Sequence, residues 1–196
     1  MDRRIEYEFY HWGPFLYKTK LLPEEIKQIK FFFKKNKKKD YRKNLAGFLK
    51  NEYTIDEKKL FPIIFPYLKS YSQAYTNYST NIINMHTMKL KSAWVNFMKK
   101  YESNPLHTHD DNLTFVLYTH IPKDLIKEYT STITSGTKPG NINFIINYGV
   151  PDQICDHSFF PQVGDFYIFP ANLVHYVNQF TCKGERVSIS GNLAYV

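Results

Sequence analysis

The stretch GDFYIFPANLVHYVNQFTCKGERVSISGN, residues 164–192, decides the fold. Its segments DFYIF, LVHYV and RVSIS are rich in β-branched and aromatic residues, and Gly, Pro and Asn stand between them. Such runs predict short β-strands divided by turns. The same pattern occurs upstream in MKLKSAWVNFM (88–98), LTFVLYT (113–119) and INFIIN (142–147). From about residue 83 to residue 196 the sequence therefore predicts an all-β sandwich or barrel.

The first 80 residues are predicted to be mainly helical. Two helices are predicted there. The second of them is expected from about Leu60 to Tyr78, where Pro62 and Pro66 should limit its start or kink it. Helices followed by strands argue against a parallel α/β sheet, so we expect one domain, with a helical layer at about 1–80 and a β-core at about 83–196. The first predicted helix carries an apolar face made of Leu22, Ile26, Ile29 and Phe33.

Composition limits the possible compartments and partners. No apolar run reaches the length of about 18 residues that suggests a membrane span, and the first residues lack the apolar segment of a signal peptide. Cys155 and Cys182 are expected to be thiols, so the predicted location is cytoplasmic. The net charge is +8, and many lysines lie in 27–44. That run is either a nucleic-acid footprint or a solvated helix end and loop.

The last predicted strand carries an unusual polar face. Arg186, Ser188 and Ser190 alternate with Val187 and Ile189, so the two sets point to opposite faces. An arginine fork pairs bidentately with a carboxylate, and a serine hydroxyl can complete such a site. The polar face is therefore predicted to line a cavity that binds an anion; the alternative is a strand that faces solvent.

Three histidines are candidates for metal binding. His107 and His109 stand two positions apart in NPLHTHDDNLTFVLY (104–118), so in an extended segment both rings point to one face. His175 lies on the later strand LVHYV. Imidazole is a common ligand of zinc, iron and copper. The remaining histidines, which we expect to be structural or solvated, are His11, His86, His120 and His157.

With these residues, the chain resembles the iron(II)/2-oxoglutarate-dependent dioxygenases of the double-stranded β-helix fold. More narrowly, it looks like the small oxygenases of marine cyanobacterial bacteriophages. The likeness lies in WVNF, NPLHTHDDNLTFVLY, GDFYIFPANLVHYV and ERVSISGN of the core, and in WGPFLYKTKLLP and DYRKNLAGFLKNEYTID of the helical part. It implies a mainly β, jelly-roll and cupin-like core with an N-terminal helical layer.

The resemblance also implies a set of site residues. Fe(II) would be held by His107, His109 and His175. 2-Oxoglutarate would be the cosubstrate, with its far carboxylate on Arg186 and Ser188, and dioxygen would bind beside it. Two further residues, which we expect on neighbouring strands and in contact with the cosubstrate, are Asn96 and Tyr118.

The chain departs from the family pattern at the first ligand motif. The family at large has His-x-Asp or His-x-Glu, whereas His107-x-His109 stands here. A second ligand set is therefore open, made of His109, Asp111 and His175. If the three histidines bind the metal, Asp110 or Asp111 is expected to accept an imidazole N–H and fix its tautomer.

The implied activity is hydroxylation of a substrate, coupled to conversion of 2-oxoglutarate into succinate. A peptidyl or prolyl residue and a nucleic acid are the expected substrate classes. One alternative is a cupin-like metal protein that does not use 2-oxoglutarate, but cupins usually add a glutamate about four positions after His-x-His, and Leu113 stands there. Another is a binding protein that has kept the fold without the chemistry.

Overall fold

The fold is that of a computed structural model, which describes residues 13–35, 39–79, 87–146 and 156–195. The helices of the described residues are α1 (Pro23–Lys35), α2 (Glu57–Ser79) and α3 (Lys123–Ser131), and a 3₁₀ turn lies at Arg42–Asn44. The strands are β1 (Tyr17–Lys20), β2 (Glu52–Thr54), β3 (Met88–Met98), β4 (Asn104–His107), β5 (Leu113–His120), β6 (Ile142–Ile145), β7 (Asp156–Phe159), β8 (Asp165–Pro170), β9 (Val174–Val177) and β10 (Arg186–Tyr195).

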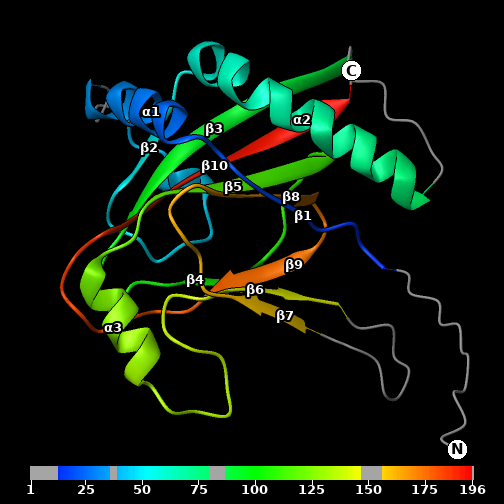
Figure 1. The fold of residues 1–196 in the computed structure, drawn as a ribbon. Coiled ribbons are helices and arrows are strands. Elements are labelled where there is room, and N and C mark those ends of the chain that lie inside the picture. The colour runs from blue at the N-terminus through cyan, green and yellow to red at the C-terminus, as the bar shows by residue number, and fades with distance from the viewer. Residues whose placement is uncertain (1–12, 36–38, 80–86, 147–155, 196) are drawn as a thin grey trace, which may run out of the picture.

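Two antiparallel sheets form the body of the protein (Figure 1). The larger sheet has the strand order β1-β8-β5-β10-β3-β2, and the smaller has the order β4-β9-β6-β7. The chain crosses repeatedly from one sheet to the other, so that most neighbouring strands are not consecutive in sequence; β2–β3 and β6–β7 are the exceptions. This arrangement confirms the predicted double-stranded β-helix core with N-terminal helices.

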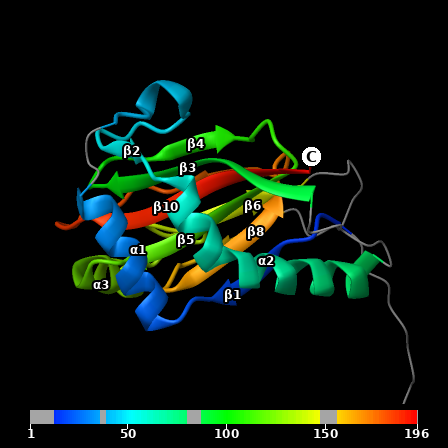
Figure 2. The ribbon, with the colours of Figure 1, turned by 90° about the horizontal axis from the view of Figure 1, so that it is seen from above.

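The helices α1 and α2 lie across the outer face of the larger sheet (Figures 1 and 2). Ile29 of α1 and Ile64 and Leu68 of α2 are fully buried in one cluster with strand residues such as Val95 and Ile189. Each helix thus has one apolar stripe against the sheet, as its spacing predicted.

Two details of the predicted helices are wrong. Leu22 is 59% exposed because α1 begins after it, and its neighbour Leu21 fills the core instead. The helix α2 begins at Glu57, so Pro62 and Pro66 lie inside it and do not set its start, whereas the alternative expectation, that they kink the helix, stays a prediction. In the described parts of the chain, no helix combines the length and the apolar character that crossing a bilayer requires.

The sequence pattern missed two strands within the first 80 residues. β1 pairs with β8, and β2 pairs with β3, so they add one strand to each edge of the larger sheet. They are only four and three residues long, which is too short for a period-two pattern to identify them. β4, β7 and α3 were also not predicted, and Leu125 of α3 packs between the two sheets.

Gly191→Ala is expected to destabilise the protein by about 1–3 kcal/mol, because overpacking of a filled core forces its neighbours apart. A Cβ atom at Gly191 would lie 2.7 Å from the ring of Phe115, which is fully buried, and 2.7 Å from the carbonyl oxygen of Ser92. Urea unfolding measures the change. Gly136→Ala is the control, since a Cβ there meets only a side-chain oxygen at 3.7 Å; equal stability of the two variants would contradict the prediction.

Candidate metal centre

The histidines His107, His109 and His175 meet at one point between the two sheets. His107 ends β4 and is the register partner of His175 on β9, while His109 follows two residues after His107. The ring centroids of His107 and His175 are 4.2 Å apart, and each is 5.2 Å from that of His109. One ligand nitrogen from each ring lies within 4.8 Å of the other two. That spacing suits three imidazoles around one metal ion.

Backbone carbonyls set the tautomers of two of these rings. Nδ1 of His107 lies 2.7 Å from the carbonyl oxygen of Pro105, and Nδ1 of His175 lies 2.9 Å from that of Leu173. A carbonyl oxygen only accepts, so each Nδ1 carries the proton and each Nε2 keeps its lone pair for a metal. Asp110 and Asp111 were expected to accept an imidazole N–H. For His107 and His175 that expectation is wrong, because the Nδ1–H of each ring already donates to a carbonyl oxygen two residues upstream.

Burial keeps the three rings neutral. Burial, together with the neighbouring histidines, lowers the pKa of His175 to about 3 and that of His109 to about 4. Burial also lowers the pKa of His107. Because protons compete with metal ions for imidazole, a cluster that is neutral at pH 7 is ready to bind a divalent cation.

We expect the metal-free protein to lose stability between about pH 6.5 and pH 4. The unfolded histidines titrate near 6.5, whereas the folded ones have lowered pKa values, so the unfolded state binds more protons in that window. Each histidine contributes at most about 1.4 kcal/mol per pH unit there. Urea unfolding at pH 7 and at pH 5, carried out on wild type and on His175→Ala, measures the loss of stability in each protein. An equal loss in both proteins would contradict this source of the pH dependence.

A cavity of about 200 Å³ adjoins the histidines. One wall is the inner face of the larger sheet, where Asn96 of β3, Ser188 of β10 and Tyr118 of β5 form one row of register partners. Arg186 and Ser190 line the cavity from the same strand as Ser188, while Val187 and Ile189 pack on the helical side. The polar residues of RVSIS therefore face the cavity and its apolar residues face the helices, as the alternation predicted. The alternative, in which the polar face is turned to solvent, is wrong.

Arg186 is 1% exposed, which is exceptional for a guanidinium. Its Nη1 donates to the carbonyl oxygen of Gly140 at 2.9 Å, and its guanidinium carbon lies 5.4 Å from the ring centroid of Tyr118. Its Nε has no hydrogen-bond partner, and among the described residues no carboxylate forms an ion pair with it. Burial lowers its pKa, yet a guanidinium remains charged at neutral pH.

Tyr118 supplies a second unpaired donor. Its hydroxyl is buried without a hydrogen-bond partner, and burial raises its pKa to about 12, so it keeps its proton. Buried polar groups normally have partners. The unpaired donors of Arg186 and Tyr118 therefore fit the carboxylate of a bound ligand. Asn96 and Tyr118 both line the cavity, although they lie on opposite sides of β10 rather than on adjacent strands.

The other sequence candidates lie apart from this centre. Asp111 is not part of the histidine cluster, and His120 and His157 are exposed, as expected. Cys182 is a free thiol. His11, His86, Cys155 and part of the lysine run 27–44 fall outside the described residues. Glu52 and Asn104 also line the cavity, and neither was predicted as a site residue. The quoted stretches that contain them gave them no role, and they reach the site on β2 and β4, strands that the pattern did not reveal.

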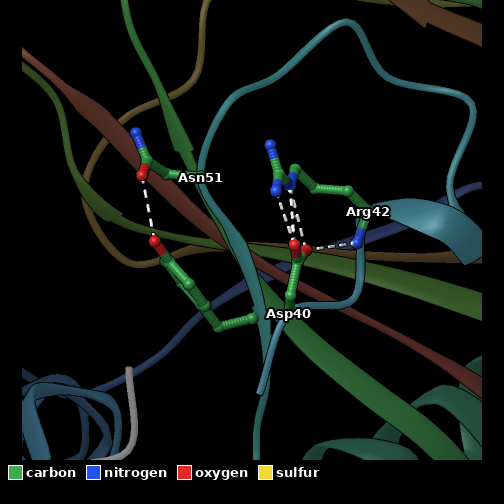
Figure 3. Close-up of polar contacts among 4 residues, drawn as sticks. Asp40, Arg42 and Asn51 are labelled. Carbon is green, nitrogen blue, oxygen red and sulfur yellow. Dashed lines mark hydrogen bonds and ion pairs between the residues drawn. The ribbon is translucent and has the colours of Figure 1, made fainter. Parts of the chain in front are cut away.

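A short loop closes the cavity on the side of β2. Residues 44–47 line it, beginning at Asn44, the last residue of the 3₁₀ turn Arg42–Asn44. Figure 3 shows how this turn is held: the guanidinium of Arg42 faces the carboxylate of Asp40, with Nε donating at 2.9 and 3.0 Å and Nη2 at 2.6 Å. The backbone N–H of Tyr41 also donates to the carbonyl oxygen of Glu52, which ties the turn to β2.

Comparisons with known proteins agree with this description. Residues 92–192 match the sequence family described as "Putative 2OG-Fe(II) oxygenase". No curated protein matches the chain in sequence.

Two solved structures share the fold across nearly the whole chain. The structure of a prolyl-4-hydroxylase from Pseudomonas putida is similar with a TM-score of 0.56 and 12% identity, over 92% of each chain. That of HygX from Streptomyces hygroscopicus, solved with nickel, 2-oxoglutarate and hygromycin B bound, has a TM-score of 0.57 and 10% identity, over 94% of this chain and 83% of that one. At such identities these likenesses establish the fold alone.

Proposed function

We propose, from the premise that the chain belongs to the 2OG-Fe(II) oxygenase family, that His107, His109 and His175 hold its iron and that Arg186 and Ser188 hold 2-oxoglutarate. The observation that carries the proposal is the buried guanidinium of Arg186, which lines the same cavity as the three histidines and has an unpaired Nε. A buried cation without a carboxylate partner is costly, and an anionic ligand would offset that cost.

Under this proposal the histidines would bind the metal, and other cavity residues would bind the far carboxylate of 2-oxoglutarate. Nε2 of His107 and of His175 would bind the metal, since their Nδ1 atoms donate to backbone carbonyls. Arg186 and Ser188 would pair with the far carboxylate of 2-oxoglutarate, and the Tyr118 hydroxyl would donate to it. When bound, Fe(II) supplies the oxidative chemistry that couples decarboxylation of 2-oxoglutarate to succinate with hydroxylation of a C–H bond.

The walls of the cavity would limit side reactions. Apolar side chains of β5, β6 and β8 line it beside His175, namely Val116, Ile142 and Phe169. They bury the site between the sheets and restrict access of water. The substrate would be a peptidyl or prolyl residue or a nucleic acid, and it would enter beside the loop at residues 44–47.

The decisive experiment adds Fe(II) and 2-oxoglutarate to the protein without oxygen. We expect a visible charge-transfer band, because a keto acid that chelates iron gives such a band in this family. Admission of oxygen should then produce succinate. Folded, iron-loaded protein without the band would instead favour a cupin-like metal protein that does not use 2-oxoglutarate.

Two variants distinguish the possible ligand sets. His107→Ala should lose iron, whereas Asp111→Ala should retain it, because only the histidine belongs to the cluster. Metal content after dialysis provides the measurement. The opposite result would assign the iron to His109, Asp111 and His175.

A further inference from the structure

Glu52 places a carboxyl group in the same cavity as the proposed metal and cosubstrate sites. It lies on β2, opposite Asn96 of β3, which in turn is opposite Ser188 of β10. Glu52 thus extends the polar row of the cavity wall by one strand beyond Asn96. Neighbouring strands are about 4.8 Å apart, so its Cα lies roughly 10 Å from that of Ser188. Of the described residues that line the cavity, only Glu52 and Arg186 belong to the classes charged at neutral pH.

One oxygen of the Glu52 carboxyl group lacks a hydrogen-bond partner. The residue is 1% exposed, and its Oε2 is buried with no hydrogen bond. The Oδ1 atom of Asn104, on the facing sheet, lines the same cavity and is likewise buried and unpaired. Two buried acceptor atoms without donors, on residues that line one cavity, call for a ligand that brings donors.

The charged side chains near Glu52 make their hydrogen bonds with other groups. Arg42, the nearby cation, directs its Nε and Nη2 at Asp40 (Figure 3). Glu102 accepts from the backbone N–H groups of Lys50 and Lys99, at 3.2 and 2.7 Å. Burial, and then the negative charge of Glu102, raise the pKa of Glu52 to about 7. A cation beside Glu52 would favour the ionised carboxylate and so offset both the burial and the charge of Glu102.

The loop at residues 44–47 is fitted closely to this end of the cavity. A Cβ atom at Gly47 would lie 2.1 Å from Oδ1 of Asn104, so only glycine lets the loop approach the amide this closely. The turn before it is held by the ion pair of Asp40 and Arg42. The acceptors therefore belong to a formed subsite between β2, β4 and the loop.

We propose that Glu52, with Asn104, forms a substrate subsite that binds a cationic nitrogen, such as the amine of a lysine side chain in a peptide or of a free polyamine. This inference rests on the proposed function, since it places the basic group of the substrate beside the metal and 2-oxoglutarate. Glu52 is a specificity-determining residue that pairs with the cation and sets which C–H bond reaches the metal. The negative backbone of a nucleic acid does not suit this carboxylate.

The test measures binding to nickel-loaded protein with 2-oxoglutarate by calorimetry. The probes are N-acetyl-lysine methylamide, spermidine and the neutral N-acetyl-norleucine methylamide. We expect the wild type to bind at least one cationic probe and to prefer it to the neutral probe by roughly tenfold or more. Glu52→Gln should remove that preference, and Glu52→Asp should retain part of it. The control is Glu24→Gln, at an exposed residue of α1.

The outcomes separate this inference from the proposed function. Binding of lysine amide alone identifies a peptide residue, and binding of spermidine alone identifies a free amine. Equal binding of the neutral probe, binding of no cationic probe, or unchanged binding by folded Glu52→Gln overturns the inference. Should Glu52→Gln not fold, the comparison of lysine and norleucine probes on wild type still decides. Failure of 2-oxoglutarate to bind would count against the proposed function. In that case, titration of the same probes into nickel-loaded protein without 2-oxoglutarate would still show whether Glu52 binds a cation.

Discussion

His175→Ala is expected to lower iron affinity at least about 100-fold and to reduce succinate formation to background. Losing a group that merely orients a metal ligand typically costs 10- to 100-fold in affinity, so loss of a ligand should cost no less. His175 is the most buried of the three histidines, and it lies opposite His107 across the β4–β9 pair. Metal content after dialysis and succinate formation from 2-oxoglutarate measure the effect.

The matched control for His175→Ala is His120→Ala. His120 is an exposed histidine at the end of β5 and is not part of the cluster. It should keep both iron and succinate formation. Circular dichroism checks that both variants are folded, since the ring of His175 lines the cavity but also lies 4.9 Å, between ring centroids, from the buried Phe169. Wild-type iron content in folded His175→Ala would refute the assignment of this ligand.

Arg186→Met is expected to weaken 2-oxoglutarate binding roughly 30-fold to several thousand-fold. Removing one partner of a buried, hydrogen-bonded charge pair typically costs 2–5 kcal/mol, which corresponds to that range. Iron should remain, since Arg186 is not in the histidine cluster. Calorimetric titration of 2-oxoglutarate into nickel-loaded protein gives the affinity, and metal content gives the iron.

The same variant makes a second, opposite prediction for the free protein. Arg186 is buried without a carboxylate partner among the described residues, so its charge is desolvated and not compensated in the absence of ligand. Arg186→Met should therefore unfold in urea at the same or a higher concentration than wild type. Ser190→Ala, on the same face of β10, should change 2-oxoglutarate affinity less. Loss of iron or of folding in Arg186→Met would mean that Arg186 is structural.

The sequence alone determined most of the β-core and the composition of its polar wall. Strand periodicity is a local property, because successive side chains point to opposite faces whatever the strand pairs with. MKLKSAWVNFM therefore predicted β3 closely and RVSIS predicted the first half of β10, and the alternation in RVSIS predicted that Arg186 and Ser188 share a face. The spacing of His107 and His109 likewise indicated that their rings could meet.

Only the tertiary structure decided which of these residues meet. The pairing of β4 with β9 brings His107 to His175 across 68 positions of sequence, and it leaves Asp111 outside the cluster. The carbonyl oxygens of Pro105 and Leu173 orient the imidazoles, and that of Gly140 accepts from Arg186; these are backbone groups whose partners no side-chain pattern indicates. Glu52 enters the cavity through a three-residue strand at the sheet edge. Register and strand order are long-range properties, so a local pattern cannot supply them.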